Sequence, residues 1–319
     1  MVTAVANIEI LSAGLQTTIQ DLGRFGFGHY GVPPSGALDS FSLRIANLLV
    51  GNAETQACLE TTLMGLRFEA LQDVLIAVTG ADLQPQIEKR PMAMWCSRIM
   101  KKKEILSFAG PKWGCRAYVA FGGDLDIVPL LGSRSTNLPA AFGGLNGRAL
   151  KKGDILPIKT PTSPFSAEGR SFEANCRFRT ADVWTLRVIW GPQHNDFSKD
   201  AQHTFVNSQF TVSSHSDRTG IRLNGPAIRR KRNTAESIIS EGLIPGSIQV
   251  PGDGQLIIML GETVTGGYRK IATIISADLP LTGQIKPGDK VKFETVSLKE
   301  AFQFLRESQE LIDEFKRGL

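Results

Sequence analysis

Glycine and proline interrupt this sequence throughout, and the segments between them are short. The chain has 32 glycines and 16 prolines among 319 residues. Proline removes a backbone donor and glycine weakens helix interiors, so this spacing favours short strands joined by turns. Residues with strand character lie at 75–80, 116–123, 183–190, 255–260, 270–276 and 291–296. The sequence therefore predicts a mainly β fold.

Two segments have helical periodicity instead. Asp39 or Ser40 can cap the first, residues 40–50, and Gly51 can end it. The second begins at Ser297, where SLKE has the pattern of a capping box. We expect the apolar side of this C-terminal helix to close the fold. Its apolar residues are Leu298, Phe302, Leu305, Ile312 and Phe315.

The length and one polar stretch predict two domains. A chain of 319 residues exceeds the size at which single cores usually stop growing, roughly 250–300 residues. Residues 158–180 lose periodicity and gain proline, serine and charge, as a linker does. We therefore expect domains at 1–165 and 180–319, the second carrying the C-terminal helix. A GD turn near a strand end in each half hints at two copies of one β-barrel-like unit.

Composition excludes several classes of protein. A hydrophobic content of 42% fits a globular core, and no apolar run approaches the ~20 residues that span a bilayer. The N-terminus lacks the pattern of a signal peptide, so we expect a cytoplasmic protein. Four widely spaced cysteines, with no histidine at ligand spacing, predict reduced thiols and no metal site.

Basic residues gather in three short runs, although the net charge is only +5. The runs are residues 101–103, 151–152 and 229–232. No helix-turn-helix, zinc-finger or RNA-recognition signature accompanies them, so neither nucleic acid nor membrane is an expected partner. Solvated loops are the favoured interpretation, and contact with an anionic ligand or a partner is the alternative.

The first candidate site follows a glycine-rich stretch before the first helix, TTIQDLGRFGFGHYGVPPSGALDS. Glycines let the backbone approach a ligand, and a helix N-terminus favours anions. The alternative is purely structural, with Asp39 and Ser35 as caps and Asp21 paired with Arg24. The candidate residues are Gln20, Asp21, Arg24, Ser35, Gly36 and Asp39.

Three further stretches combine turns with polar groups. GSRST, residues 132–136, sets a guanidinium between hydroxyl groups, which suits a carboxylate, phosphate or ureido oxygen, although an Arg–Asp pair explains it as well. PGDGQ and TGGYRK flank a predicted strand, where glycine pairs can admit a ligand or only satisfy turn geometry. In SDRTG, a self-contained ion pair of Asp217 and Arg218 is slightly favoured over a catalytic role. The candidates are Ser133, Arg134, Ser135, Thr136, Asp253, Thr265, Gly266, Gly267 and Tyr268. We expect Ser133–Thr136 to gather in space with the residues of the first candidate site, because both stretches combine permissive glycines with polar side chains.

These stretches, together with ACLETTLMG, GPQHNDF and SDRTGIRLNGP, resemble the allophanate hydrolase subunit 2 or KipA-like family over residues 8–293. The family includes the C subunit of bacterial 5-oxoprolinase and part of the carboxyltransferase region of urea carboxylase. The resemblance implies two cyclophilin-like β-barrel subdomains. The sequence departs from the family pattern in GETVTGGYRK, where Glu262, Val264 and Arg269 replace the usual Asp, Thr and Pro, and in the later placement of Gln284.

The function that the resemblance implies is that of a KipA-like subunit of an ATP-dependent 5-oxoprolinase, which opens 5-oxoproline to glutamate. Expected partners are a KipI-like chain (allophanate hydrolase subunit 1) and a LamB/YcsF-like chain. The complex would use ATP, although this chain has no Walker loop. Alternatives are a biotin-dependent urea or amide carboxylase, with biotin on a partner chain, and a non-catalytic antagonist of a KipI-like kinase inhibitor. Arg24, Asp39 and Arg134 are the candidate catalytic residues, and the remaining candidates would bind substrate.

Overall fold

The computed structural model describes residues 5–159, 161, 163, 165–173, 183–232, 234–235 and 237–319. The chain forms two compact units. The N-terminal unit comprises Met1–Phe25, Ser35–Arg179 and Glu314–Leu319, and the C-terminal unit comprises Gly26–Pro34 and Thr180–Asp313. The units differ from the predicted ranges because a short N-terminal segment joins the C-terminal unit and the last residues join the N-terminal one.

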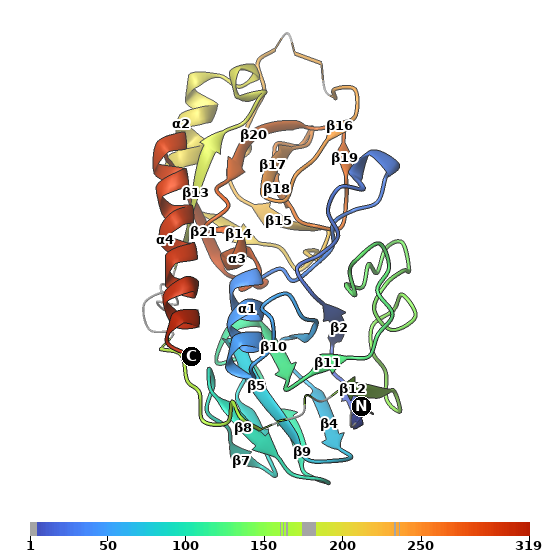
Figure 1. The fold of residues 1–319 in the computed structure, drawn as a ribbon. Coiled ribbons are helices and arrows are strands. Elements are labelled where there is room, and N and C mark those ends of the chain that lie inside the picture. Colours follow the sequence, from blue (N-terminus) through green and yellow to red (C-terminus); the bar gives the residue numbers. More distant parts are fainter. Residues whose placement is uncertain are drawn as a thin grey trace. The chain divides into compact units, whose positions relative to one another are not determined.

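In the described residues, two antiparallel sheets and the helix α1 (Ser40–Leu49) form most of the N-terminal unit (Figure 1). Its strands are β1 (Val5–Ala13), β2 (Gln16–Gln20), β3 (Cys58–Thr62), β4 (Leu66–Ala70), β5 (Val74–Asp82), β6 (Pro85–Ile87), β7 (Arg90–Pro91), β8 (Ser97–Met100), β9 (Ile105–Phe108), β10 (Trp113–Phe121), β11 (Asp124–Leu125) and β12 (Ile155–Lys159). One sheet has the order β11-β12-β1-β4-β9-β6-β7, and the other has β2-β3-β10-β5-β8.

One hydrophobic core joins the two sheets of this unit. Ile8 of β1, Ile19 of β2 and Val78 of β5 belong to the same buried cluster. Phe68 of β4 meets Phe121 of β10 edge to face, with ring centroids 5.7 Å apart. Residues of opposite sheets thus interdigitate as in a packed sandwich.

The C-terminal unit is built on a closed barrel (Figure 1). Its strands are β13 (Val183–Trp190), β14 (Phe210–Val212), β15 (Gly220–Asn224), β16 (Glu241–Gly242), β17 (Ser247–Val250), β18 (Leu256–Met259), β19 (Thr265–Gly266), β20 (Arg269–Ile274) and β21 (Lys290–Thr295). The barrel order is β13-β20-β17-β18-β15-β14-β21, and β13 pairs with β21 in parallel. β16 and β19 form a separate two-stranded sheet.

The mainly β prediction is confirmed. All six predicted strand segments are strands, namely β5, β10, β13, β18, β20 and β21. The barrel of the C-terminal unit closes, whereas the strands of the N-terminal unit form two sheets around their shared core. Cys58, Cys96 and Cys115 are free thiols, as predicted, and Cys176 lies outside the described residues.

Both predicted helices exist, with the predicted caps. In α1 (Ser40–Leu49) the Asp39 carboxylate accepts a hydrogen bond from Ser42 N at 2.9 Å, and Gly51 has a φ of 80°. In α4 (Leu298–Arg317) Ser297 N donates to the Glu300 carboxylate at 2.7 Å and Glu300 N donates to Ser297 Oγ at 3.2 Å. The hydrogen bonds that the Glu300 carboxylate accepts from Ser297 N and Ser297 Oγ lower its pKa. The sequence did not predict α2 (Lys199–Asn207) or α3 (Leu279–Thr282).

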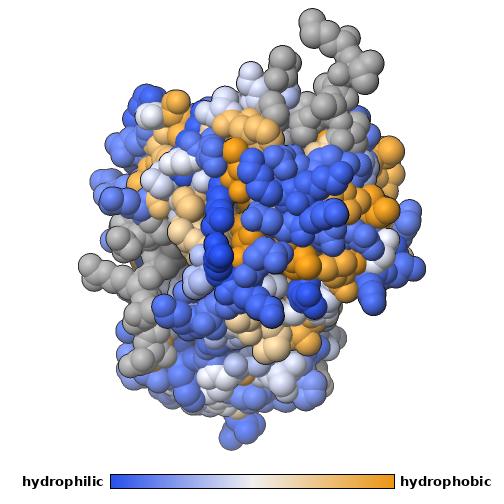
Figure 2. Space-filling model, turned by 90° about the horizontal axis from the view of Figure 1, so that it is seen from below, coloured by the Kyte–Doolittle hydropathy of each residue, from blue (hydrophilic) through white to orange (hydrophobic). Residues whose placement is uncertain are grey.

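The apolar stripe of α4 does not close the fold along its whole length, which corrects the prediction. Leu298 is 59% exposed and Phe302 is 57% exposed, whereas Ile312 is buried. No helix in the described part of the chain is long and apolar enough to cross a membrane. The face drawn in Figure 2 is largely hydrophilic, with smaller hydrophobic strips between the polar areas.

The predicted GD turn before β12 is fixed by an ion pair whose effect depends on pH. Two hydrogen bonds of 2.8 Å from the Arg148 guanidinium hold the pKa of the Asp154 carboxyl below its usual 3.8. A lowered folded-state pKa stabilises the fold above that usual value, and the stabilisation is lost as pH falls through the folded-state pKa. We expect Arg148→Gln to lower the free energy of unfolding by about 1–2 kcal/mol at pH 7.

The measurement is urea unfolding of both proteins between pH 7 and pH 3. The difference between wild type and Arg148→Gln should shrink progressively below about pH 4, because the unfolded chain then binds a proton at Asp154 that the folded wild type, with its lowered pKa, binds only at lower pH. A difference that stayed constant down to pH 3 would contradict this role of the pair.

Candidate functional site

The two predicted N-terminal segments meet around one buried carboxylate. Asp21 follows β2 directly, and its carboxylate accepts hydrogen bonds from Ser133 Oγ at 2.6 Å, Ser135 Oγ at 2.5 Å and Arg134 N at 2.5 Å. Gly23 N adds a fourth at 2.8 Å. We call Asp21, Ser133, Arg134 and Ser135 the Asp21 cluster. The prediction that these distant segments gather in space is confirmed.

Neighbouring residues extend this junction. Thr136 Oγ1 donates to Ile19 O at 3.0 Å, and the Gln20 amide donates to Thr136 O at 3.1 Å. Asn137 donates to Ser35 Oγ at 3.0 Å. A Cβ on Gly36, whose φ is 90°, would lie 2.9 Å from the Leu22 carbonyl, so only glycine permits this approach.

These polar groups hold the two segments together. Gln20, Ser133, Ser135 and Thr136 are at most 1% exposed, and Asp21 is 7% exposed. A ligand would have to break existing hydrogen bonds to reach them, at the cost of leaving buried groups unsatisfied. Their predicted contact with substrate stays a prediction, and the geometry gives them a structural role first.

The two candidate catalytic arginines are also engaged. The Arg24 side chain is 2% exposed, donates to the carbonyls of Ser135 and Leu130, and lies over the Phe142 ring at 4.8 Å. Arg134 donates to Asp124 at 2.8 Å and to Ile127 O at 2.8 Å. Burial raises the pKa of Asp124, and the Arg134 charge opposes that shift. Arg134 of GSRST therefore follows the alternative interpretation of that stretch, in which the arginine pairs with an aspartate of the protein.

Asp39 caps α1 from a buried position. Its side chain also accepts from Ser42 Oγ at 2.6 Å, and the residue has no exposed surface. Its backbone N–H donates to Tyr118 Oη at 2.8 Å, and Tyr118 donates to Glu60 at 2.8 Å. Burial and the nearby carboxylates raise the pKa of Tyr118. The geometry supports a cap and does not support a catalytic Asp39. Neither Glu60 nor Tyr118 was among the predicted site residues, although Glu60 lies in the ACLETTLMG motif.

The candidates of the C-terminal unit occupy turns and the small sheet. Asp253 accepts a hydrogen bond from Gln255 N at 3.0 Å within the turn before β18. Thr265 and Gly266 form β19, and Tyr268 is 41% exposed. A Cβ on Gly266 would lie 2.5 Å from the Gln249 amide nitrogen, so this glycine serves close packing. Gly267 is half-buried beside Tyr268.

A second polar group in this unit was not predicted as a site. The Lys270 ammonium pairs with the Glu241 carboxylate, which also accepts from the Gln193 amide at 2.6 Å. Lys270 N donates to Gln193 Oε1 at 3.1 Å. Lys270 is 6% exposed, whereas the Glu241 side chain is 42% exposed, and the hydrogen bond from Lys270 lowers the pKa of Glu241. GPQHNDF and TGGYRK contained two of these residues, so the motifs were a usable signal.

In the described SDRTG segment, the structure does not have the predicted ion pair of Asp217 with Arg218. Arg218 pairs with Glu262 at 3.0 Å, and the two side chains are 4% and 0% exposed. The Asp217 carboxylate accepts from Thr219 N at 2.7 Å and Gly220 N at 3.1 Å. The predicted partner of Arg218 was therefore wrong, because the barrel brings Glu262 to it from the loop after β18.

The chemistry of the described residues is that of positioned hydrogen-bond donors. Within that part of the chain, no group of three or more His, Cys, Asp or Glu side chains is arranged to hold a metal ion. Burial raises the pKa of the Cys58 thiol far above its usual value, which keeps it protonated and a poor nucleophile. Lys270 and backbone N–H groups can polarise a carbonyl oxygen of a small molecule.

Comparison with known proteins gives consistent matches along the chain. The family model described as carboxyltransferase domain, subdomain A and B, matches residues 30–295. The C subunit of the 5-oxoprolinase of Escherichia coli (strain K12) is 38% identical over 311 residues, which cover 96% of this chain and 97% of that protein. The subunit of the same name from Haemophilus influenzae is 34% identical and covers 97% of this chain and 98% of that protein.

Solved structures agree with the sequence matches. The crystal structure of the K. lactis urea amidolyase superposes with a TM-score of 0.91 at 31% identity. The match covers 97% of this chain but only 20% of the amidolyase. Both units of the chain therefore have a counterpart within one part of that larger protein.

Proposed function

The chain belongs to the carboxyltransferase domain, subdomain A and B, family, and on that basis we propose that it is the C subunit of an ATP-dependent 5-oxoprolinase. The reaction opens the lactam of 5-oxoproline to give glutamate. The observation that carries the proposal is the 38% identity to the C subunit of a bacterial 5-oxoprolinase along 97% of that protein's length. We propose for it a KipA-like role in a cytoplasmic complex.

We propose that this chain contributes hydrogen-bond donors to the opening of the lactam and does not supply a nucleophile. Cleavage of an unstrained amide places negative charge on the carbonyl oxygen, and each positioned donor contributes about 3–4 kcal/mol to the transition state. Lys270 fits this role best, because its ammonium is paired with the Glu241 carboxylate, whose side chain is 42% exposed. Arg24 and Arg134 are second choices: like Lys270 they already hold protein oxygens, but the Asp124 partner of Arg134 is only 28% exposed, and Arg24 holds backbone carbonyls from a position 2% exposed.

Partner chains complete the proposed enzyme. The sequence has no Walker loop, which would bind the phosphates of ATP. It also has no G-x-S-x-G elbow, which would supply a serine nucleophile. We propose a KipI-like chain and a LamB/YcsF-like chain as partners. ATP would be consumed by the assembled complex.

A second candidate is the carboxyltransferase component of a biotin-dependent urea or amide carboxylase. The TM-score of 0.91 to the K. lactis urea amidolyase favours it. A carboxyl transfer would need the ureido oxygen of carboxybiotin polarised, which the same donors can do. Biotin would then arrive on a partner chain.

Reconstitution tests the proposed function and separates the two candidates. We expect the purified chain alone to be inactive, and the chain with its KipI-like and LamB/YcsF-like partners to form glutamate and ADP from 5-oxoproline and ATP. Lys270→Gln should lower kcat/KM of the complex by about 100-fold, whereas Lys292→Gln, an exposed lysine on β21, should not change it.

Two results would contradict the proposal. Turnover of 5-oxoproline by the single chain would remove the need for partners. Activity that requires a biotinylated chain and urea, with none on 5-oxoproline, would select the carboxylase instead. Full activity of Lys270→Gln would exclude Lys270 from the site while leaving the assignment to the 5-oxoprolinase complex intact.

A further inference from the structure

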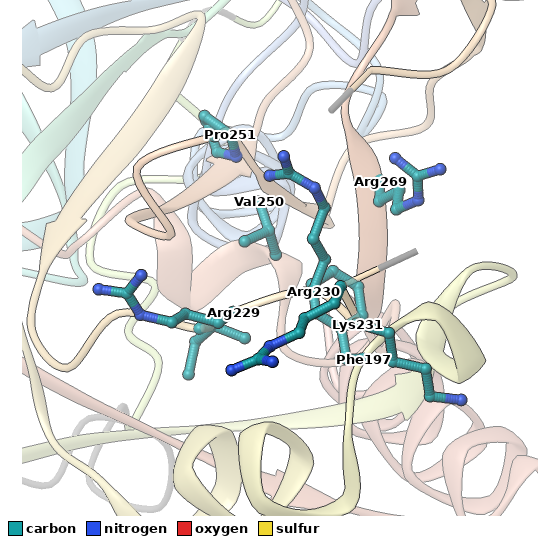
Figure 3. Close-up of a pocket in the computed structure, with 10 residues that line it drawn as sticks. Phe197, Arg229, Arg230, Lys231, Val250, Pro251 and Arg269 are labelled. Carbon is teal, nitrogen blue, oxygen red and sulfur yellow. The ribbon is translucent and has the colours of Figure 1, made fainter. Parts of the chain in front are cut away.

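A basic pocket opens on the C-terminal unit, and residues of the PGDGQ and TGGYRK stretches form part of its wall. Its volume is about 440 Å³, within the range of small-molecule sites. Apolar side chains of Phe197, Ile228 and Val250 contribute to its wall. In Figure 3, Arg229 and Arg269 lie on opposite sides of Val250 and Pro251. Its cationic lining residues are Arg229, Arg230, Lys231, Arg232 and Arg269.

The positive charge of this pocket exceeds its local negative charge. Arg269 pairs with Asp196 at 2.6 Å and is 7% exposed. Among the residues that the structure describes, it is the only one of the five cations with a carboxylate partner. Arg230 is half-buried and donates from Nε to Thr234 O at 3.2 Å, and the other three are exposed. Four consecutive cations therefore keep most of their charge available.

The basic segment is fixed to the barrel rather than left as a free loop. Ile228 is 1% exposed, and its N–H donates to Gly254 O at 2.9 Å. Gly254 has a φ of 80°, and a Cβ there would lie 3.0 Å from Ile228 N. Lys231 N donates to Asp196 O at 2.8 Å, and Arg230 forms a β-bridge with Phe197. The backbone thus holds the cations close together against their mutual repulsion.

Such an arrangement suits an anion with several charges on a short chain. Guanidinium groups match the geometry of phosphate oxygens and can bind two at once. A single carboxylate would offset only one of the four charges, whereas a diphosphate or triphosphate group spreads several charges over neighbouring phosphorus atoms. We propose that this pocket binds an oligophosphate group, with Arg229 and Arg232 among its contacts. The proposal concerns binding by this chain alone, so it can hold or fail independently of the proposed function.

Titration calorimetry with inorganic tripolyphosphate tests the pocket directly. At constant ionic strength we expect the wild-type chain to bind it and Arg229→Gln/Arg232→Gln to bind about 10-fold more weakly or worse, because two charge-assisted contacts are lost. The matched control is Lys151→Gln/Lys152→Gln, which removes the same charge from an exposed turn of the N-terminal unit and should leave affinity within about 2-fold.

Three outcomes would overturn the proposal. They are no binding by the wild-type chain, an equal loss in both double variants, and citrate binding as tightly as tripolyphosphate. An equal loss of affinity in both double variants would show that only the net charge of the protein matters. Equal affinity for citrate and tripolyphosphate would show that the pocket does not select phosphate groups. Titration with ATP then identifies the source of the group: tighter binding than tripolyphosphate indicates a nucleotide, and equal binding indicates the phosphate chain alone. Both of these results support the site.

Discussion

Replacing Asp21 with alanine should lower the free energy of unfolding by about 3–5 kcal/mol, because two buried and two part-buried donors lose one charged acceptor. Those donors are the two serine hydroxyls and the Arg134 N–H of the Asp21 cluster, and Gly23 N. The segment 132–136 should then separate from the end of β2. Activity of the reconstituted complex should fall with stability, since the same carboxylate holds both segments.

Urea unfolding of Asp21→Ala and Asp253→Ala makes the comparison. Asp253 was predicted for the same role but accepts one backbone hydrogen bond in an exposed turn, so its loss should cost less than about 1 kcal/mol. If Asp21→Ala keeps wild-type stability but loses activity, the carboxylate serves the substrate, and our structural interpretation of the cluster is wrong.

The strands and helices of the fold could be predicted from short sequence patterns, because strand periodicity and helix capping depend on neighbouring residues. Strand character at residues 183–190 identified β13, and the caps at Asp39 and Ser297 marked where α1 and α4 begin. Glycine turns with polar side chains also indicated that the stretches around Asp21 and Ser133 belong together. These inferences needed only the period of a strand, the capping of a helix and the chemistry of a turn.

The roles of the polar residues could not be predicted in the same way. Sequence neighbours suggested Asp21 for Arg24 and Asp217 for Arg218, but β-sheets bring residues distant in sequence together. In the structure, Arg134 forms an ion pair with Asp124, and Arg218 forms one with Glu262. Which carboxylate an arginine meets depends on strand register and barrel closure, and neither is encoded within one short motif.

The exposed apolar side of α4 is a second feature that sequence patterns could not fully predict. The spacing of Leu298, Phe302 and Leu305 does place them on one side of a helix. Periodicity identifies an apolar side, but what lies against it depends on tertiary structure. Here Leu298 and Phe302 remain more than half exposed, while Ile312, farther along the same helix, is buried.

Breaking the Arg218–Glu262 pair should be the second large effect on stability. The guanidinium and carboxylate lie 3.0 Å apart with almost no exposed surface. Glu262→Ala should cost about 3–5 kcal/mol, because the Arg218 charge then stays buried without this partner. Arg218→Ala should cost a similar amount. The double variant should cost clearly less than the sum, because the second truncation no longer leaves a buried charge behind.

Chemical unfolding of the two single variants and the double variant gives the coupling energy of the pair. The matched control is the cycle for Lys159 and Asp126, whose side chains lie 2.6 Å apart but are 50% and 43% exposed. Solvent screens that pair, so its coupling should stay below about 1 kcal/mol. Arg218→Met/Glu262→Leu should recover much of the lost stability, since apolar residues of similar volume need no charged partner. Additive losses at Arg218 and Glu262, as small as those of the exposed control, would show that burial does not make this ion pair important.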